Sequence, residues 1–292
     1  MPTTTAPVTD VVDRIERTSA LDPVVKGLRA ATQKVLAAQG LRDALNGVWL
    51  GHPLHPVLTD IPIGAWSAAA VLDVVPGTGI GASTLIATGC AAAVPTALTG
   101  LADWSDLHGP HQRVGVIHAA ANVVALGFYT ASLGARMRGR KVRGKALAYA
   151  GLAAMTAGGY LGGHLAFRQG AGANHGADIP DLFPGGWHDI GTLDEFPDGA
   201  PAKRTVEGVD LLVVRRGQHV DVLSNKCSHL SGPLSDGEFT VDAGQGCIVC
   251  PWHGSTFRLA DGAVRHGPAT SPQHRFETRT SGGRLEVSLS GE

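Results

Sequence analysis

The sequence predicts a multidomain protein in which an N-terminal all-α four-helix transmembrane bundle is followed by an all-β domain. Long uncharged stretches fill the middle of the 292-residue chain, and no charged residue occurs between Asp73 and Asp103. Beyond Trp187, short β-like runs such as VDLLVV and RLEVSL alternate with glycine-containing turns. The 40 glycines and the aromatic content of only 5% are typical of glycine- and alanine-rich membrane helices.

Four segments follow from this change of character along the chain. Residues 1–50 carry mixed charges among apolar residues at helical spacing and are expected to form an amphipathic helical lead-in. The transmembrane domain is expected over 51–168, a polar linker over 169–185, and the β domain over 186–292. The first 40 residues contain no apolar core of signal-peptide length, so we expect no cleavable leader.

The uncharged stretches have the length of membrane helices. A bilayer core of ~30 Å requires about 20 helical residues. We expect the first span to be the weakest, because Asp60 must lie near an interface or face the bundle. Glycines on the last helix give the small-residue spacing that allows close helix contact. The expected spans are 57–75, 80–102, 114–135 and 146–167, and the glycines are Gly158, Gly159, Gly162 and Gly163.

Two cysteine–histidine pairs in the β domain predict a metal site. They are Cys227-x-His229 and Cys250-x-x-His253, with 20 residues between His229 and Cys250. A structural zinc ion would accept two thiolates and two imidazoles. However, each pair supplies one cysteine and one histidine from a loop with small residues. Such a set favours a two-iron cluster whose irons have different ligands.

The two motifs, CSHLSGPL from Cys227 and CPWHGSTF from Cys250, together with Gly267-Pro268-Ala269, resemble the Rieske 2Fe–2S family over about residues 186–289. The resemblance implies that Cys227 and Cys250 hold one iron, that His229 and His253 hold the other, and that the stretch from Gly267 shields the cluster. The cluster environment that it implies comprises Leu230, Ser255, Phe257, Gly267 and Pro268.

Departures from the respiratory branch of that family indicate a lower reduction potential. In that branch each motif carries an additional cysteine and the two form a disulfide, but Gly232 and Trp252 occupy those positions here. Phe257 stands where high-potential members have a tyrosine, so one hydrogen bond toward the cluster is expected to be missing. Ser255 is retained as a donor, and Cys247 is expected to be a small buried side chain.

Several functional classes are disfavoured. The formal net charge of −1 gives no electrostatic case for nucleic acid as a partner. An oxygenase of the resembled family needs a second iron site in a large domain after the Rieske domain, and only about 23 residues follow Ala269. We therefore expect an electron carrier or oxidoreductase subunit rather than a Rieske oxygenase, and no catalytic residue is assigned.

The histidines of the membrane domain are unevenly placed. With four antiparallel spans, His52, His55, His108, His111, His118 and His164 all belong to one side of the membrane, which the β domain shares. His118 and His164 are expected at similar depth, ~6–8 Å inside the boundary. The candidate polar layer comprises His52, His55, Asp60, His118, Asn122, Tyr160 and His164.

Three interpretations of this layer remain open: a hydrogen-bonded layer that fixes helix packing, a b-type haem between His118 and His164, and a quinone pocket that exchanges protons through histidine and aspartate. The stretch LGHPLHPVLTDIPIGAW also resembles an uncharacterised bacterial four-helix membrane domain over roughly 48–168. That resemblance implies a family and no activity.

The basic residues between the last two spans predict the orientation. Arg136, Arg138, Arg140, Lys141, Arg143 and Lys145 crowd this loop. Positive-inside counting therefore favours a multi-pass protein of the bacterial cell membrane with the β domain on the extracytoplasmic side.

The preferred prediction is a membrane-anchored electron-transfer protein embedded in lipid. It would relay electrons between a redox partner, such as a dehydrogenase or hydrogenase, and the quinone pool, with haem b or quinone in the membrane domain as open options. The alternatives are a quinol/quinone oxidoreductase module with its own pocket and a simple membrane-tethered Rieske ferredoxin.

Overall fold

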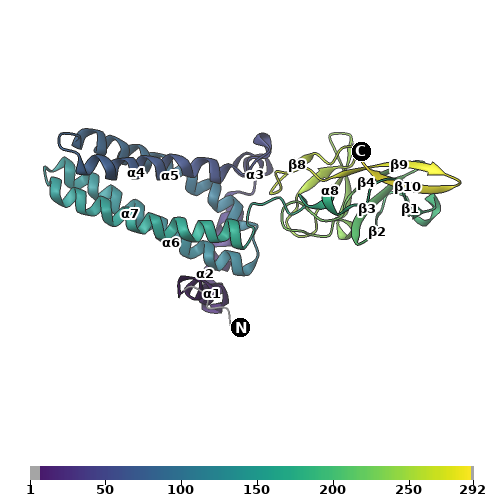
Figure 1. Cartoon of the computed structure of the whole chain (residues 1–292), viewed down its shortest axis with the longest axis horizontal. Coiled ribbons are helices and arrows are strands. Elements are labelled where there is room, and N and C mark those ends of the chain that lie inside the picture. The colour runs from purple at the N-terminus through teal and green to yellow at the C-terminus, as the bar shows by residue number, and fades with distance from the viewer. Residues whose placement is uncertain (1–6, 291–292) are drawn as a thin grey trace. The chain divides into compact units, whose positions relative to one another are not determined.

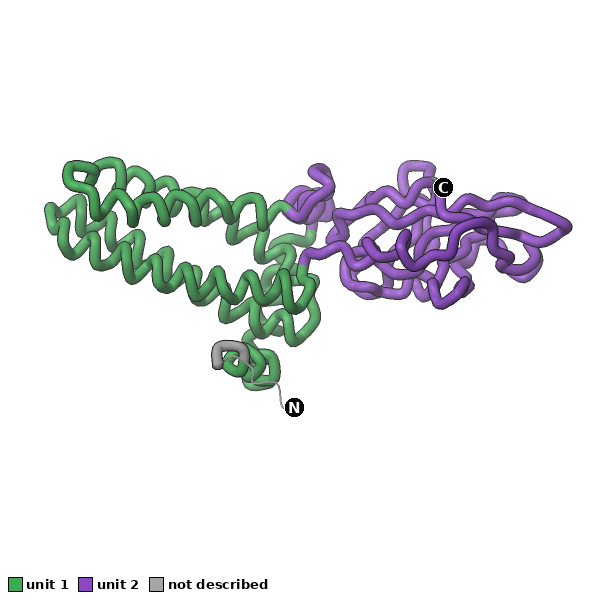
Figure 2. The backbone as a smooth tube through the Cα atoms, in the orientation of Figure 1, with its two compact units in different colours: residues 1–37, 54–171 green, residues 38–53, 172–292 purple. Residues whose placement is uncertain are grey.

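The computed structural model describes residues 7–290 and divides into two compact units (Figure 2). The outermost residues of the predicted lead-in and of the predicted β domain, 1–6 and 291–292, lie outside the described residues. The helical unit contains the chain up to residue 37 together with 54–171. The β unit contains 172–292 together with residues 38–53, which come before the membrane helices in the sequence. The all-α part followed by an all-β part confirms the predicted fold class.

Four long helices joined by short connections form the body of the helical unit (Figure 1). They run in alternating directions, and a π-helical turn, η3 (His164–Arg168), follows the last of them. The helices are α4 (Leu54–Val74), α5 (Gly79–Ser105), α6 (Gly109–Met137) and α7 (Lys141–Gly163).

Among the described residues, α4, α5 and α6 are long and apolar enough to cross a membrane. Helix α7 was predicted as the fourth span and is a 23-residue helix, but it does not reach the same mean hydropathy. Its first turns carry basic residues, and its glycines and two tyrosines dilute the apolar content.

Small residues bring these helices into close contact. The ring of Trp66 stacks on Tyr129 at a centroid distance of 4.2 Å. A Cβ atom at Gly89 would lie 2.3 Å from the Trp66 ring nitrogen, so only glycine fits there. The predicted glycines of α7 are not equivalent. Gly158 and Gly162 face α6, whereas a Cβ at Gly159 would meet nothing within 4 Å.

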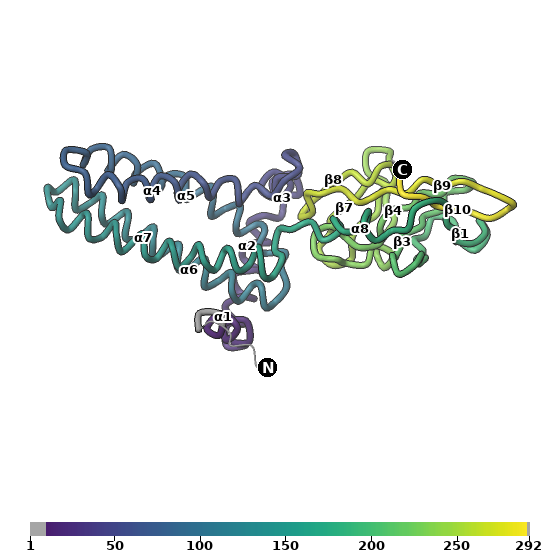
Figure 3. Tube along the Cα trace, viewed as in Figure 1, coloured from purple at the N-terminus to yellow at the C-terminus, as the bar shows by residue number. Residues whose placement is uncertain are grey.

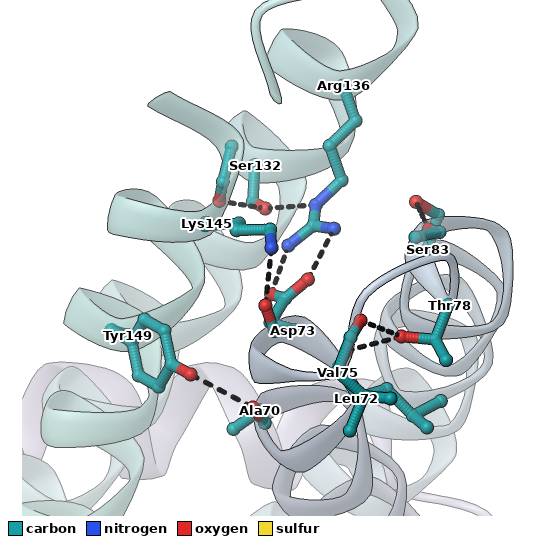
Figure 4. A network of polar contacts seen from close by, with 12 residues as sticks. Ala70, Leu72, Asp73, Val75, Thr78, Ser83, Ser132, Arg136, Lys145 and Tyr149 are labelled. Atoms are coloured by element: carbon teal, nitrogen blue, oxygen red, sulfur yellow. Dashed lines mark hydrogen bonds and ion pairs between the residues drawn. The ribbon is translucent and has the colours of Figure 1, made fainter. Parts of the chain in front are cut away.

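A network of charges closes the α6–α7 end of the helical unit (Figure 4). The fully buried carboxylate of Asp73 accepts two hydrogen bonds from the guanidinium of Arg136. Lys145 donates to the Asp73 carbonyl, and Arg136 Nε donates to Ser132 Oγ at 3.1 Å. This network ties the ends of α4, α6 and α7 together.

Three short elements complete the helical unit. Helices α1 (Pro7–Arg17) and α2 (Asp22–Val35), joined by η1 (Ser19–Leu21), contact α5 and α6. The guanidinium of Arg113 donates to the Asp22 carboxylate at 2.7 Å. This ion pair holds the start of α2 against α6.

The strands of the β unit, which run from green to yellow in Figure 3, form two antiparallel sheets. The larger sheet has the order β1-β10-β9-β4-β3-β2, and the smaller has the order β5-β6-β7-β8. The strands are β1 (His188–Gly191), β2 (Pro201–Val206), β3 (Val209–Arg216), β4 (His219–Ser224), β5 (Glu238–Asp242), β6 (Gln245–Val249), β7 (Thr256–Arg258), β8 (Val264–His266), β9 (Arg275–Ser281) and β10 (Arg284–Leu289).

Short helices flank these sheets: α3 (Gln39–Asn46), η2 (Val48–Leu50), α8 (Ile179–Leu182), η4 (Leu193–Glu195) and η5 (Leu234–Asp236). One core cluster is built around Phe196, Leu211 and Phe276 of the larger sheet. A second cluster contains Cys227 and Cys250 together with Ile248 and Phe257. The two cysteines of the predicted metal site are therefore part of the apolar core.

Candidate metal centre

The first cysteine–histidine pair lies on a tight loop that follows β4. The backbone N–H of Cys227 donates to Gly232 O at 2.9 Å, and the N–H of Ser231 donates to Cys227 O at 2.8 Å. Ser231 has a φ of 64°, in the left-handed region. The loop directs the backbone amides of His229 and Leu230 at the sulfur of Cys227.

The second loop, between β6 and β7, repeats this backbone pattern. Cys250 N–H donates to Ser255 O at 2.8 Å, and Gly254 N–H donates to Cys250 O at 3.1 Å. Gly254 has a φ of 77°, so each loop has its left-handed residue four positions after the cysteine. The amides of Trp252 and His253 face the Cys250 sulfur. The two loops are thus equivalent, and each directs backbone N–H donors at the sulfur of its own cysteine. Such donors stabilise anionic sulfur.

The four predicted ligands are arranged in pairs. The thiols of Cys227 and Cys250 are hydrogen-bonded to each other, and the rings of His229 and His253 meet edge to face at a centroid distance of 5.1 Å. Within residues 7–290, no three histidine, cysteine or acidic side chains converge on one point. A two-sulfur, two-nitrogen set split in this way fits a two-iron cluster better than a single tetrahedral ion.

The electrostatics of the thiols suit metal ligation, which requires the thiolate. The hydrogen bond with Cys227 and the amides of Trp252 and His253 lower the pKa of Cys250 to about 7, against the opposing effect of burial. The same thiol pair and burial raise the pKa of Cys227. One of the two thiols therefore ionises readily before the other.

The burial of the site is asymmetric. Cys227 and Cys250 are buried in the core, whereas His229 and His253 are half-buried and Trp252 is 47% exposed. The imidazole side of the site therefore lies nearest to solvent.

The third predicted loop lies directly over the second motif. The N–H of Ala269 donates to Ser255 Oγ at 3.0 Å, and the Ser255 side chain is fully buried. Because the hydroxyl accepts this bond, its own hydrogen remains available to a sulfur acceptor. Phe257 and Cys247 are fully buried on neighbouring strands, and Leu230 is also buried.

The two positions that lack cysteine are in contact. A Cβ atom at Gly232 would lie 2.8 Å from Cys250 Sγ and 3.2 Å from the Trp252 ring. All four cysteines are free. The indole of Trp252 therefore packs against the backbone of Gly232, in the space that a side chain at position 232 would fill.

Helix α3 supplies a functional residue that sequence reasoning missed. Asp43 accepts hydrogen bonds from the Gly267 N–H at 2.9 Å and from His266 Nδ1 at 2.8 Å. Asn46 is buried beside it, and a Cβ at Gly267 would lie 3.0 Å from Asn46 Nδ2. Asp43 is one charged residue among many in the lead-in, and no motif in the sequence marks it as a partner of the third loop.

His118 is held within the helix bundle by hydrogen bonds. Its Nδ1 donates to Gly158 O at 2.7 Å, and its Nε2 lies 3.2 Å from the Asn122 amide. The ring of His55 meets it edge to face at 6.4 Å, and His55 Nδ1 donates to Thr96 O at 2.9 Å. The structure thus pairs His118 with His55 in a polar layer.

His164 has a different partner. Its Nε2 lies 2.6 Å from Glu16 Oε1 of α1, a residue that sequence reasoning did not single out. Because the Nε2 atoms of both His118 and His164 face polar groups of the protein, the two imidazoles do not fit as the axial pair of one haem in this arrangement.

The remaining candidates lie outside this layer. The buried face of α4 carries Pro62, Trp66 and Ala69 at helical spacing, which turns Asp60 outward, and Asp60 is exposed rather than part of the layer. Tyr160 is 45% exposed on α7. His52 belongs to the β unit, where its exposed ring lies 2.9 Å from Pro53 O.

Comparisons with known proteins agree with both halves of the chain. A Rieske 2Fe–2S domain matches residues 186–277, and a family described as predicted membrane protein (DUF2231) matches residues 51–175. The ferredoxin subunit of anthranilate 1,2-dioxygenase from Burkholderia cepacia is 32% identical over 35% of this chain and 92% of its own length.

The oxygenase component of 3-ketosteroid-9-alpha-monooxygenase from Rhodococcus rhodochrous is 39% identical over 26% of this chain, and the match spans only 19% of that relative. Among solved structures, the ferredoxin of carbazole 1,9a-dioxygenase from Nocardioides aromaticivorans IC177 is 30% identical over 36% of this chain and 98% of its own, with a TM-score of 0.33. The chain therefore belongs to the Rieske 2Fe–2S family and joins its Rieske domain, in one polypeptide, to a membrane domain of the DUF2231 family.

Proposed function

We propose that this protein is a membrane-tethered Rieske ferredoxin, which carries one electron at a time for a redox partner. The observation that carries the proposal is the two-by-two arrangement of Cys227, Cys250, His229 and His253. When bound there, a 2Fe–2S cluster would supply one-electron redox chemistry. The cysteines would hold one iron and the histidines the other.

Different residues of the site would serve different functions in such an electron carrier. The core around Cys227 and Cys250 keeps water from the sulfur ligands, and the backbone amides of the two loops stabilise their negative charge. The half-buried imidazoles of His229 and His253 provide the edge through which a partner exchanges electrons. Since a tyrosine donor is replaced by Phe257, we expect a reduction potential below that of quinol-oxidising relatives.

EPR and optical spectra of the purified full-length protein test this proposal. We expect one reducible 2Fe–2S centre per chain, and we expect Cys227→Ser and His253→Ala each to remove it while Cys247→Ser retains it. Retention of the centre in both ligand variants would overturn the ligand assignment. A single bound zinc ion in place of iron would overturn the function.

A relay to the quinone pool is the second candidate, and the His55–His118 pair favours it. Two imidazoles in an apolar bundle are costly and have the chemistry to exchange protons with a quinone. Quinol added to the purified protein would reduce the cluster, and His55→Ala with His118→Ala would abolish that reduction. Unchanged reduction in this double variant would leave the pair with a packing role only.

The electron donor or acceptor is proposed to be a dehydrogenase, a hydrogenase or an oxygenase component. The ferredoxin subunit to which this chain is similar is named for a dioxygenase system, which makes the oxygenase class a partner to test beside the other two. We also propose that the cluster faces the extracytoplasmic side, because the basic residues gather in the α6–α7 connection.

A further inference from the structure

A groove of about 830 Å³ runs along the outer face of α6 and over the start of α7, and none of its lining residues belongs to the metal centre or to the histidine layer. Small residues of α6 form its floor, and three arginines stand at one end. Its lining includes Val123, Gly127, Thr130, Arg138, Arg140 and Arg143, and we call it the arginine groove.

The floor of the groove is apolar and open. Val123 is 68% exposed, and a Cβ atom at Gly127 would meet nothing within 4 Å. The hydroxyl of Thr130 donates to Leu126 O at 2.8 Å within the helix, so it requires no outside partner. From Val123 to Arg138 the floor is about 22 Å long at 1.5 Å per residue, which exceeds the ~15 Å of one leaflet's hydrocarbon.

Among the described residues, no acidic side chain pairs with the arginines at the end of the groove. Asp73 engages two other basic residues, Arg136 in the last turn of α6 and Lys145 near the start of α7, as Figure 4 shows. Arg140 and Arg143 are exposed, and neither forms an ion pair with an acidic side chain of residues 7–290. No acidic residue occurs in the sequence between Asp106 and Asp178. A bound anion from outside the chain would therefore supply the negative charge that Arg140 and Arg143 lack as a partner.

We propose that the arginine groove binds one anionic phospholipid, with an acyl chain along the floor of α6 and the phosphate between Arg140 and Arg143. Guanidinium groups match phosphate oxygens in geometry and charge, and basic pockets beside membrane helices bind anionic headgroups. A second copy of the chain fits less well, because it would bring a second set of arginines against the first.

Binding of phosphatidylglycerol and of phosphatidylcholine to the detergent-solubilised full-length protein, measured by native mass spectrometry, tests this proposal. We expect phosphatidylglycerol to bind at least tenfold more tightly. Arg140→Gln with Arg143→Gln should weaken it about tenfold or more, since each basic residue near a phosphate contributes measurably. The matched control, Lys26→Gln with Lys34→Gln, removes the same charge from the exposed surface of α2, outside the groove, and should leave the affinity unchanged.

A second pair of variants tests the floor without changing charge. Gly127→Leu fills the groove and should weaken phosphatidylglycerol binding, whereas Gly159→Leu adds the same bulk on α7, where a Cβ also meets nothing within 4 Å, and should not. Equal binding of the two lipids, or an equal loss in the charge control, would overturn the proposal. Equally effective competition by glycerol phosphate would identify a free anion as the occupant, and a dimer lost in Gly127→Leu would identify a second copy. Either result would overturn the assignment of a phospholipid as the occupant of the arginine groove.

Discussion

At the scale of single residues, the third loop of the metal centre is bound by a carboxylate that is far from it in the sequence. Asp43 accepts hydrogen bonds from His266 and Gly267, 223 and 224 positions away. Its negative charge lies against the loop that covers the proposed cluster. A negative charge near a redox centre disfavours the reduced form, which has one more electron.

Asp43→Asn should therefore raise the reduction potential of the centre. A rise of roughly 30–60 mV corresponds to between about three- and tenfold in the equilibrium constant of a one-electron couple. Optically monitored redox titration measures it. Glu277→Gln makes the same charge change at an exposed position on β9 of this unit. An equal shift of the potential in that control would show that the position of Asp43 at the third loop does not cause the effect.

Gly232 lies directly against the sulfur of a predicted cluster ligand. A Cβ there would lie 2.8 Å from Cys250 Sγ, closer than van der Waals contact allows. Gly232→Ala should reduce the iron and the visible absorbance per chain by more than half, because the added methyl displaces a ligand sulfur. Gly40→Ala, where a Cβ meets nothing within 4 Å, should keep both. A fully loaded Gly232→Ala protein would contradict the geometry.

At the scale of elements, the two ligand loops share one backbone plan with different residues at the left-handed position. Ser231 has a φ of 64°, and Gly254 has a φ of 77°. A residue with a Cβ is disfavoured in this region by roughly 1–2 kcal/mol. The first loop therefore carries a strain that the second avoids.

Reciprocal substitutions should change stability in opposite directions. Ser231→Gly should raise the free energy of unfolding of the iron-loaded protein, and Gly254→Ala should lower it by about 1–2 kcal/mol, since a Cβ at Gly254 meets no atom within 4 Å and only the dihedral angle is affected. Chemical denaturation followed by cluster absorbance measures both changes. Changes of the same sign would show that strain is not the controlling factor.

Sequence reasoning succeeded where the signal was local. The long helices, the all-β character of the C-terminal domain and the paired motifs follow from hydropathy, alternation and spacing within a few residues. Asp43 and Glu16 could not be found in this way, because their partners lie 223 and 148 positions away. The outward position of Asp60 depends on which face of α4 is buried, and this is set by packing against other helices.

Helix α2 shows how the lead-in is fixed to the helical unit. The hydrogen bond from Arg113 holds the pKa of Asp22 below its usual value. Because the folded-state pKa is lowered, this contribution is present above the unfolded pKa of about 4 and is lost as pH falls through the folded value. Protease cleavage around η1 should therefore increase below about pH 4. Asp22→Asn should give the increased cleavage already at neutral pH, and cleavage unaffected by this variant would contradict the role of the ion pair.

At the scale of the whole molecule, the number of membrane crossings decides where the cluster works. Helices α4, α5 and α6 have the length and hydropathy of spans, and α7 is long enough but less apolar. If α7 crosses, the β unit follows on the side opposite to the basic connection of α6 and α7. If α7 does not cross, the basic loop and the cluster share one side.

Two variants of the full chain, each with one added cysteine, distinguish these topologies when they are compared with the unsubstituted protein. Gly282→Cys lies in the exposed β9–β10 turn, and Lys141→Cys lies at the exposed start of α7, beside the other basic residues of the α6–α7 connection. Since α7 packs closely on α6 through Gly158 and Gly162, its lower hydropathy is compensated by helix contact, and we expect it to cross. An impermeant maleimide should then label Gly282→Cys in intact cells and Lys141→Cys only after permeabilisation. Labelling of both from the same side would place α7 outside the set of spans, and labelling in the reverse order would put the cluster in the cytoplasm.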